Sequence, residues 1–175
     1  MKSVILAGGC FWGVQHYLKQ VKGVVKTLVG YTSGTTAFPT YELVCTGMTG
    51  HTEACKIEYD SSDTHLNILM EHFFFTIDPT LLNQQGMDVG SQYRTGIYYY
   101  EEEDLKIITS YIDSIKNNYS SPIVVEVKPA TEFWEAEEYH QDYLEKNPGG
   151  YCHIGENKYC AIDKVDSFAR TNKKI

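Results

Sequence analysis

Apolar residues recur along this chain at two spacings, one typical of strands and one typical of helices. Cys55, Ile57 and Tyr59 alternate with polar residues, which predicts a half-buried strand. In segments 12–21 and 105–115 the apolar residues instead recur every three or four positions, which predicts amphipathic helices. The whole pattern predicts strands over residues 3–7, 24–29, 54–59, 95–100 and 123–128, and helices over 12–21, 64–77 (capped by Asp63), 101–115 and 134–146.

The order of these elements up to residue 100 is β-α-β-β-α-β, which is the ferredoxin-like, or split β-α-β, arrangement. We therefore expect an α+β two-layer sandwich with a mixed sheet, an extra C-terminal helix and a coil-like tail. A length of 175 residues suits a single domain over residues 1–175, with a mobile tail over 146–175. Segments 30–52 and 80–93 are irregular, and long loops in a compact domain are usually functional.

Charge and composition exclude several classes of function. The net charge is −8 and the only basic run is Lys173-Lys174, which disfavours binding to nucleic acid or to an anionic membrane. No stretch approaches the length of a membrane span, and the apolar start of the chain is too short for a secretory signal. We expect a cytoplasmic protein.

The cysteines indicate redox chemistry rather than a structural framework. They are Cys10, Cys45, Cys55, Cys152 and Cys160. An odd number without an export signal argues against structural disulfides. The closest pair, Cys152 and Cys160, is separated by seven residues, wider than zinc-ligand pairs, so we expect no metal.

Cys10 follows an apolar strand and two glycines and precedes a helix. The unpaired N–H groups and the dipole at a helix start favour a thiolate, so we expect a reactive nucleophile there. Phe11 and Trp12 place an apolar wall beside it. The ordinary alternative is a small buried hydrophobic residue.

Three further segments carry polar groups that could converge on Cys10. Glu53 ends the first irregular loop, where an aromatic environment would raise its pKa and make it a proton donor; the alternative is a solvated edge glutamate. Asp88 and Tyr93 lie in a polar loop and could orient a substrate or a water, or simply form a turn and pack. Cys152 lies in a glycine-rich segment, which suits a thiol that must reach an oxidised Cys10.

With these motifs the chain resembles the peptide methionine sulfoxide reductases of the A type over most of its length. The matching runs are Gly9-Cys-Phe-Trp-Gly13, Gly30-Tyr31, Pro39-Thr-Tyr41, Cys45-Thr-Gly-Met-Thr-Gly-His-Thr-Glu53, Asp78-Pro-Thr80, Asn83-Gln-Gln-Gly-Met-Asp-Val-Gly-Ser-Gln-Tyr-Arg94, Glu137-Glu-Tyr-His-Gln-Asp-Tyr-Leu144 and Asn147-Pro-Gly-Gly-Tyr-Cys152. Two departures are Met87, where the family usually has asparagine, and Ile77, where histidine commonly stands.

The resemblance implies a single catalytic domain and a role for each matching residue. Cys10 corresponds to the nucleophile, Phe11 and Trp12 to the wall that holds the substrate methyl group, and Glu53 to the acid that protonates the sulfoxide oxygen. Tyr41, Tyr93 and Asp88 correspond to polar groups around that oxygen, and Cys152 to the resolving cysteine; Cys160 is a possible second recycling thiol.

The implied reaction reduces methionine-S-sulfoxide, free or in oxidised proteins, through a sulfenic acid and a Cys10–Cys152 disulfide. Thioredoxin is the implied reductant, and neither a metal nor an organic cofactor is needed. Three alternatives stay open: a thiol peroxidase-like redox enzyme, a cysteine amidase that uses His51 as base, and a ferredoxin-like binding module without activity. Cys45 and Cys55 are expected only to pack.

Overall fold

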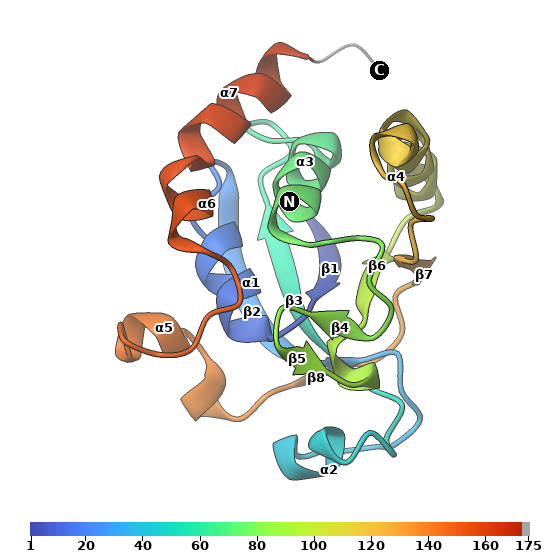
Figure 1. The fold of residues 1–175 in the computed structure, drawn as a ribbon, viewed down its shortest axis with the longest axis vertical. Coiled ribbons are helices and arrows are strands. Elements are labelled where there is room, and N and C mark those ends of the chain that lie inside the picture. Colours follow the sequence, from blue (N-terminus) through green and yellow to red (C-terminus); the bar gives the residue numbers. More distant parts are fainter. Residues whose placement is uncertain (173–175) are drawn as a thin grey trace.

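A six-stranded mixed sheet forms one layer of the protein, in a computed structural model that describes residues 1–172 (Figure 1). Lys173-Lys174 lies outside the described residues. The strands are β1 (Lys2–Gly8), β2 (Val24–Thr32), β3 (Thr52–Tyr59), β6 (Thr95–Tyr99), β7 (Glu126–Pro129) and β8 (Phe133–Glu135). Their order is β7-β6-β1-β3-β2-β8, and every neighbouring pair is antiparallel except β6 and β7. The predicted α+β class with a mixed sheet is confirmed.

Helices cover one face of this sheet, and the main core lies between the two layers. The long helices are α1 (Phe11–Leu18), α3 (Leu66–Thr76), α4 (Glu102–Ile115) and α7 (Ile162–Thr171). Alternate strand residues such as Leu6, Cys55 and Ile57 are fully buried against apolar residues of α1 and α3. On the opposite face Ile5, Ala7, Ala54 and Tyr98 form a minor cluster with the half-buried Phe133. The alternation at 55–59 was therefore a correct guide to burial.

Short elements fill the segments between the strands and at the end of the chain. They are α2 (Tyr41–Cys45), the hairpin of β4 (Gln84–Gln85) and β5 (Asp88–Val89), η1 (Ser91–Tyr93), η2 (Lys116–Asn118), η3 (Glu138–His140), α5 (Tyr143–Lys146) and α6 (Glu156–Cys160). Within residues 1–172 no helix combines the length and hydropathy needed to cross a bilayer.

Two predictions for the C-terminal third were wrong. The predicted helix over 134–146 is instead β8, paired with the edge of β2, followed by η3 and the single turn of α5. Asp142 adopts a left-handed backbone with φ 52°, so no helix can run through it. The predicted coil-like tail is largely helical, because Val165 and Ala169 are buried on the inner side of α7.

Smaller shifts concern helix and strand starts. Helix α3 begins after His65 rather than after Asp63, because Asp60–Thr64 forms a turn first. Strand β7 begins at Glu126, three residues later than predicted.

Candidate active site

Cys10 stands where β1 passes into α1, at the junction that the sequence predicted. It is the N-cap residue of α1 and only 7% exposed. The preceding Gly9 has φ +85°, and a Cβ there would lie 2.6 Å from Cβ of Gln85. A residue with a side chain would both strain the backbone and collide with β4, so glycine is required for this turn.

The expected shift of Cys10 towards thiolate is corrected by the structure. Burial raises the pKa of the Cys10 thiol well above its ordinary value, and the negative charge of Glu53 raises it further. The backbone N–H of Trp12 opposes this shift, but it does not outweigh the loss of solvation. Cys10 is therefore a thiol in the substrate-free site.

Glu53 is the second buried ionisable group at the start of α1. It lies on β3 opposite Tyr31, is 1% exposed, and its Oε2 accepts a hydrogen bond of 3.0 Å from the backbone N–H of Phe11. Burial raises its pKa to about 8, against the lowering effect of the Phe11 N–H and with a smaller contribution from Asp88. A carboxyl with this pKa is protonated at neutral pH, and the alternative of a solvated edge glutamate is excluded.

Tyr41, Tyr93 and Asp88 come from three separate elements, α2, η1 and β5, and converge on the same region. Burial is the main cause that raises the pKa of both phenols, and the charge of Glu53 adds to it, which places both hydroxyls near that carboxyl. Asp88 also raises the pKa of Tyr93, and its Oδ2 accepts a hydrogen bond of 3.0 Å from the hydroxyl of Tyr151. The two phenols therefore stay protonated and can donate hydrogen bonds.

The aromatic residues Phe11 and Trp12 occupy the first turn of α1. The ring of Phe11 lies 5.1 Å from that of His140, and the ring of Trp12 stacks on Tyr143 at 3.7 Å. Nε1 of Trp12 donates a hydrogen bond of 3.0 Å to Nδ1 of His140. Burial lowers the pKa of His140, so this imidazole is neutral and its Nδ1 can accept.

Sequence reasoning missed four residues that support this site: Glu137, His140, Tyr143 and Tyr151. Glu137 accepts two hydrogen bonds of 2.8 Å, from the hydroxyl of Tyr31 and from the backbone N–H of Tyr41. The sequence did contain a signal for such a residue, because the indole N–H of Trp12 beside a nucleophile needs a hydrogen-bond acceptor. The incorrectly predicted helix over 134–146 concealed that this segment supplies the acceptor.

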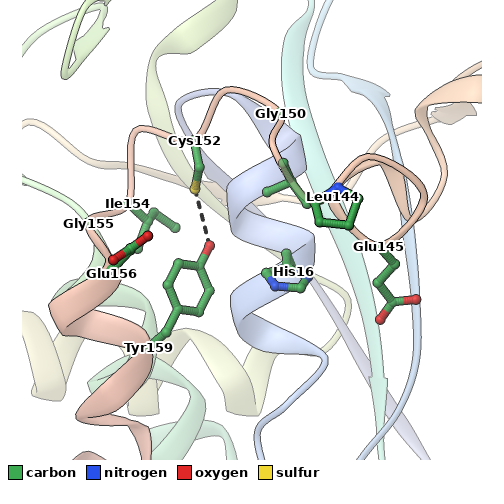
Figure 2. Close-up of a pocket in the computed structure, with 10 residues that line it drawn as sticks. His16, Leu144, Glu145, Gly150, Cys152, Ile154, Gly155, Glu156 and Tyr159 are labelled. Atoms are coloured by element: carbon green, nitrogen blue, oxygen red, sulfur yellow. Dashed lines mark hydrogen bonds between the residues drawn. The ribbon is translucent and has the colours of Figure 1, made fainter.

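Cys152 lies directly over the first turn of α1. Its Sγ is 3.2 Å from the hydroxyl of Tyr159, and a Cβ built on Gly13 would come within 2.9 Å of that sulfur. A cavity of about 630 Å³ opens beside it, between α1, α5 and α6 (Figure 2). Because Cys10 caps this same helix, the fold brings the two cysteines to one helix end.

Among the other cysteines, Cys45 lies close to Tyr41 and Glu53, at the edge of this arrangement. Cys55 is fully buried, as predicted, whereas Cys45 and Cys160 are exposed, so the expectation that Cys45 packs was wrong. Ile77 is buried beneath the site and Met87 is exposed at the β4–β5 turn.

The fold and these residues define an oxidoreductase that acts on sulfur groups. The family model described as peptide methionine sulfoxide reductase matches residues 2–172, and the chain belongs to this family.

Named relatives agree with this assignment. A protein of Clostridium botulinum (strain Loch Maree / Type A3), named peptide methionine sulfoxide reductase MsrA, is 57% identical over 154 residues, which are 88% of this chain and 98% of the relative. The crystal structure of Mxr1 from Saccharomyces cerevisiae in reduced form is 35% identical with a TM-score of 0.84, over 88% of this chain and 91% of Mxr1. Methionine sulfoxide reductase A of Corynebacterium diphtheriae is 34% identical with a TM-score of 0.78, over 86% and 77%. Mxr1 in complex with Trx2 also matches, at 24% identity and a TM-score of 0.59 over 81% of this chain and 84% of Mxr1, and at that identity the likeness concerns the fold alone.

Proposed function

We propose that this protein reduces methionine-S-sulfoxide, free and in proteins, with Cys10 as nucleophile and Glu53 as general acid. One observation carries the proposal: Cys10 caps α1 while Glu53 accepts the hydrogen bond from Phe11, the first residue of that helix. The sulfur and a protonated carboxyl therefore face one small region. A sulfoxide sulfur becomes electrophilic when its oxygen is protonated, so these two groups suit this substrate.

The reaction balances without any further reagent. The sulfur of Cys10 attacks the sulfoxide sulfur and forms an S–S bond, while the proton of Glu53 moves to the sulfoxide oxygen. The hydroxyl then passes from the substrate sulfur to the sulfur of Cys10 as the S–S bond breaks, and the electron pair of that bond stays on the sulfur of methionine. The products are methionine and the sulfenic acid of Cys10, and the thiol proton of Cys10 restores Glu53 to its acid form. The hydroxyls of Tyr41 and Tyr93 donate hydrogen bonds to the oxygen, and Asp88 orients water close to them.

The aromatic wall selects a methyl sulfoxide. Phe11 is buried, and the Trp12 ring is fixed both by stacking on Tyr143 and by its hydrogen bond to His140. A fixed apolar surface accepts the methyl group on one side of the sulfoxide while the polar groups take the oxygen on the other. One pocket then fits one epimer at sulfur, and we assign it to the S epimer on the family resemblance.

Recycling uses Cys152 and an external dithiol. The sulfenic acid of Cys10 condenses with the thiol of Cys152 to a disulfide and water, and thioredoxin then reduces this disulfide by exchange. Cys160 is a candidate second thiol, because α6 ends there in an exposed position. Mxr1 has been solved in complex with Trx2, which agrees with this choice of reductant. In this role the protein repairs oxidative damage in the cytoplasm.

We also infer that residues 1–175 form one catalytic domain built on a ferredoxin-like unit. The four central strands follow the order β6-β1-β3-β2 with antiparallel neighbours, which agrees with a split β-α-β sheet.

The test of the activity offers both sulfoxide epimers to the purified protein with dithiothreitol. We expect methionine from the S epimer and none from the R epimer, because only one epimer places its oxygen at Glu53 and its methyl on Trp12. Methionine is quantified by chromatography. Failure to reduce the S epimer, together with rapid consumption of hydrogen peroxide, would favour the thiol peroxidase alternative.

The test of recycling compares Cys152→Ser with Cys160→Ser. We expect Cys152→Ser to release about one methionine per enzyme and then stop when thioredoxin is the reductant, because the sulfenic acid has no partner thiol. Cys160→Ser should keep cycling, since its side chain is exposed and the Cys152 thiol remains over α1. Full cycling by Cys152→Ser and its loss in Cys160→Ser would move the resolving role to Cys160.

A further inference from the structure

We propose that the hydroxyl of Tyr159 positions and activates Cys152 for its attack on oxidised Cys10, which rests on the resolving role proposed above. The two side chains point towards one another across the wall of the cavity beside α1 (Figure 2). Their atoms Oη and Sγ are 3.2 Å apart, within hydrogen-bond distance for a sulfur partner. Both side chains are half-buried, so neither is fully exposed to solvent.

The hydroxyl of Tyr159 has two acceptors within reach, Sγ of Cys152 and the carbonyl oxygen of Gly13 at 3.5 Å. While Cys152 is a thiol, its S–H donates to the phenol oxygen and the phenol donates to Gly13. When Cys152 loses its proton, the phenol turns its hydrogen to the thiolate sulfur. Burial raises the pKa of Tyr159 far above its ordinary range, so the phenol keeps the proton that this exchange needs.

Aromatic rings of α1 pack against Tyr159, and the helix α7 that follows it is fixed to the rest of the protein. Its ring lies 5.3 Å from that of His16 and 5.7 Å from that of Tyr17, both on α1. The following helix α7 is fixed on the body of the protein by Arg170, which donates hydrogen bonds to the carbonyls of Asp63 (2.7 Å) and Lys22 (3.1 Å). These contacts fix the Tyr159 hydroxyl beside the thiol of Cys152.

The step it serves is the condensation of two sulfur atoms. The thiolate of Cys152 attacks Sγ of the Cys10 sulfenic acid, the S–S bond forms, and the leaving hydroxide takes a proton to become water. The phenol stabilises the attacking thiolate and holds it over the first turn of α1. The phenol of Tyr159 neither gains nor loses a proton over the whole step.

The test is Tyr159→Phe, which removes the hydroxyl and keeps the ring. The reduced enzyme is mixed with one equivalent of methionine-S-sulfoxide, and methionine, dimedone-trapped sulfenic acid and the disulfide are followed in time by mass spectrometry. We expect unchanged methionine release and a disulfide step about tenfold slower, the order of magnitude of a lost hydrogen bond to a charged group. Sulfenic acid should therefore accumulate.

The two chemical steps separate the role of the hydroxyl from a structural effect. A loosened fold would slow methionine release as well, whereas loss of the hydroxyl slows only the disulfide step. The titratable groups that line the cavity, His16, Glu145 and Glu156, are the same in both proteins.

The matched control is Tyr100→Phe. Tyr100 is 47% exposed, Nζ of Lys56 lies over its ring, and within residues 1–172 its hydroxyl makes no hydrogen bond. Its removal should change neither step. An equally fast or faster disulfide step in Tyr159→Phe, with recycling still dependent on Cys152, overturns the proposal for Tyr159 alone. Recycling that survives Cys152→Ser instead overturns the resolving role itself.

Gly13→Ala tests the position of the sulfur without touching the hydroxyl. The added methyl would stand 2.9 Å from Sγ of Cys152 and must push it away from α1. We expect a slower disulfide step here too, although alanine favours the helix. An unchanged step would show that the placement of Cys152 over this turn does not matter.

Discussion

Cys10→Ser abolishes the reduction of methionine-S-sulfoxide, with the rate of methionine release falling by about 10⁴-fold or more. A serine hydroxyl is a far weaker nucleophile than a thiol, and within residues 1–172 no histidine is hydrogen-bonded to Cys10 that could activate it. It also cannot form the sulfenic acid through which the sulfoxide oxygen leaves. The measurement is methionine released in a single turnover without reductant.

Cys160→Ser is the matched control for this experiment, because it removes another thiol that is exposed at the end of α6. It should release methionine at the wild-type rate in the first turnover. Circular dichroism and thermal unfolding of Cys10→Ser establish that the buried hydroxyl has not unfolded the protein. A folded Cys10→Ser protein that still reduces the S epimer would place the nucleophile at a different cysteine.

Glu53→Gln lowers the rate of methionine release by about 10²- to 10⁴-fold, which is the usual contribution of a general acid. The amide oxygen can still accept the hydrogen bond from Phe11, so the start of α1 is preserved. The amide has no acidic proton to give to the sulfoxide oxygen. The binding of substrate should change little, so the loss falls on kcat rather than on KM.

The same residue sets the pH dependence of the wild-type protein. Burial raises the pKa of Glu53 to about 8, so the acid form is present at neutral pH and disappears above that value. Methionine release should therefore fall as the pH rises through about 8. In Glu53→Gln this decline should vanish, and a decline of the same shape in the variant would assign it to another group.

Glu53 also makes the folded state lose stability as the pH rises. Its pKa is raised from an ordinary 4.5 to about 8 on folding, so between these values the folded state holds a proton that the unfolded state releases. Each pH unit in this window lowers the free energy of unfolding by up to about 1.4 kcal/mol. Glu53→Gln lacks this loss, so its stability relative to wild type should rise from pH 5 to pH 8 in urea titrations.

Local patterns in the sequence determined much of this protein. The alternation at residues 55–59 predicted the buried side of β3, because successive side chains of a strand point to opposite faces. Two glycines between an apolar run and a helix pattern predicted the turn that places Cys10 at a helix start. The motif runs gave the family. All of these features depend on neighbours within a few residues.

Only the tertiary structure decided the protonation states of Glu53 and Cys10 and the hydrogen-bond partners of the site residues. Whether Glu53 is an acid or a solvated carboxylate depends on the desolvation that β2, β3 and α1 impose together, and the same desolvation reversed the expected shift of Cys10. The contacts of Trp12 with His140 and of Cys152 with Tyr159 join segments that the sequence pattern described wrongly as a helix and a coil. Spacing along the chain determines periodic structure, whereas solvation and long-range contacts exist only once the chain has folded.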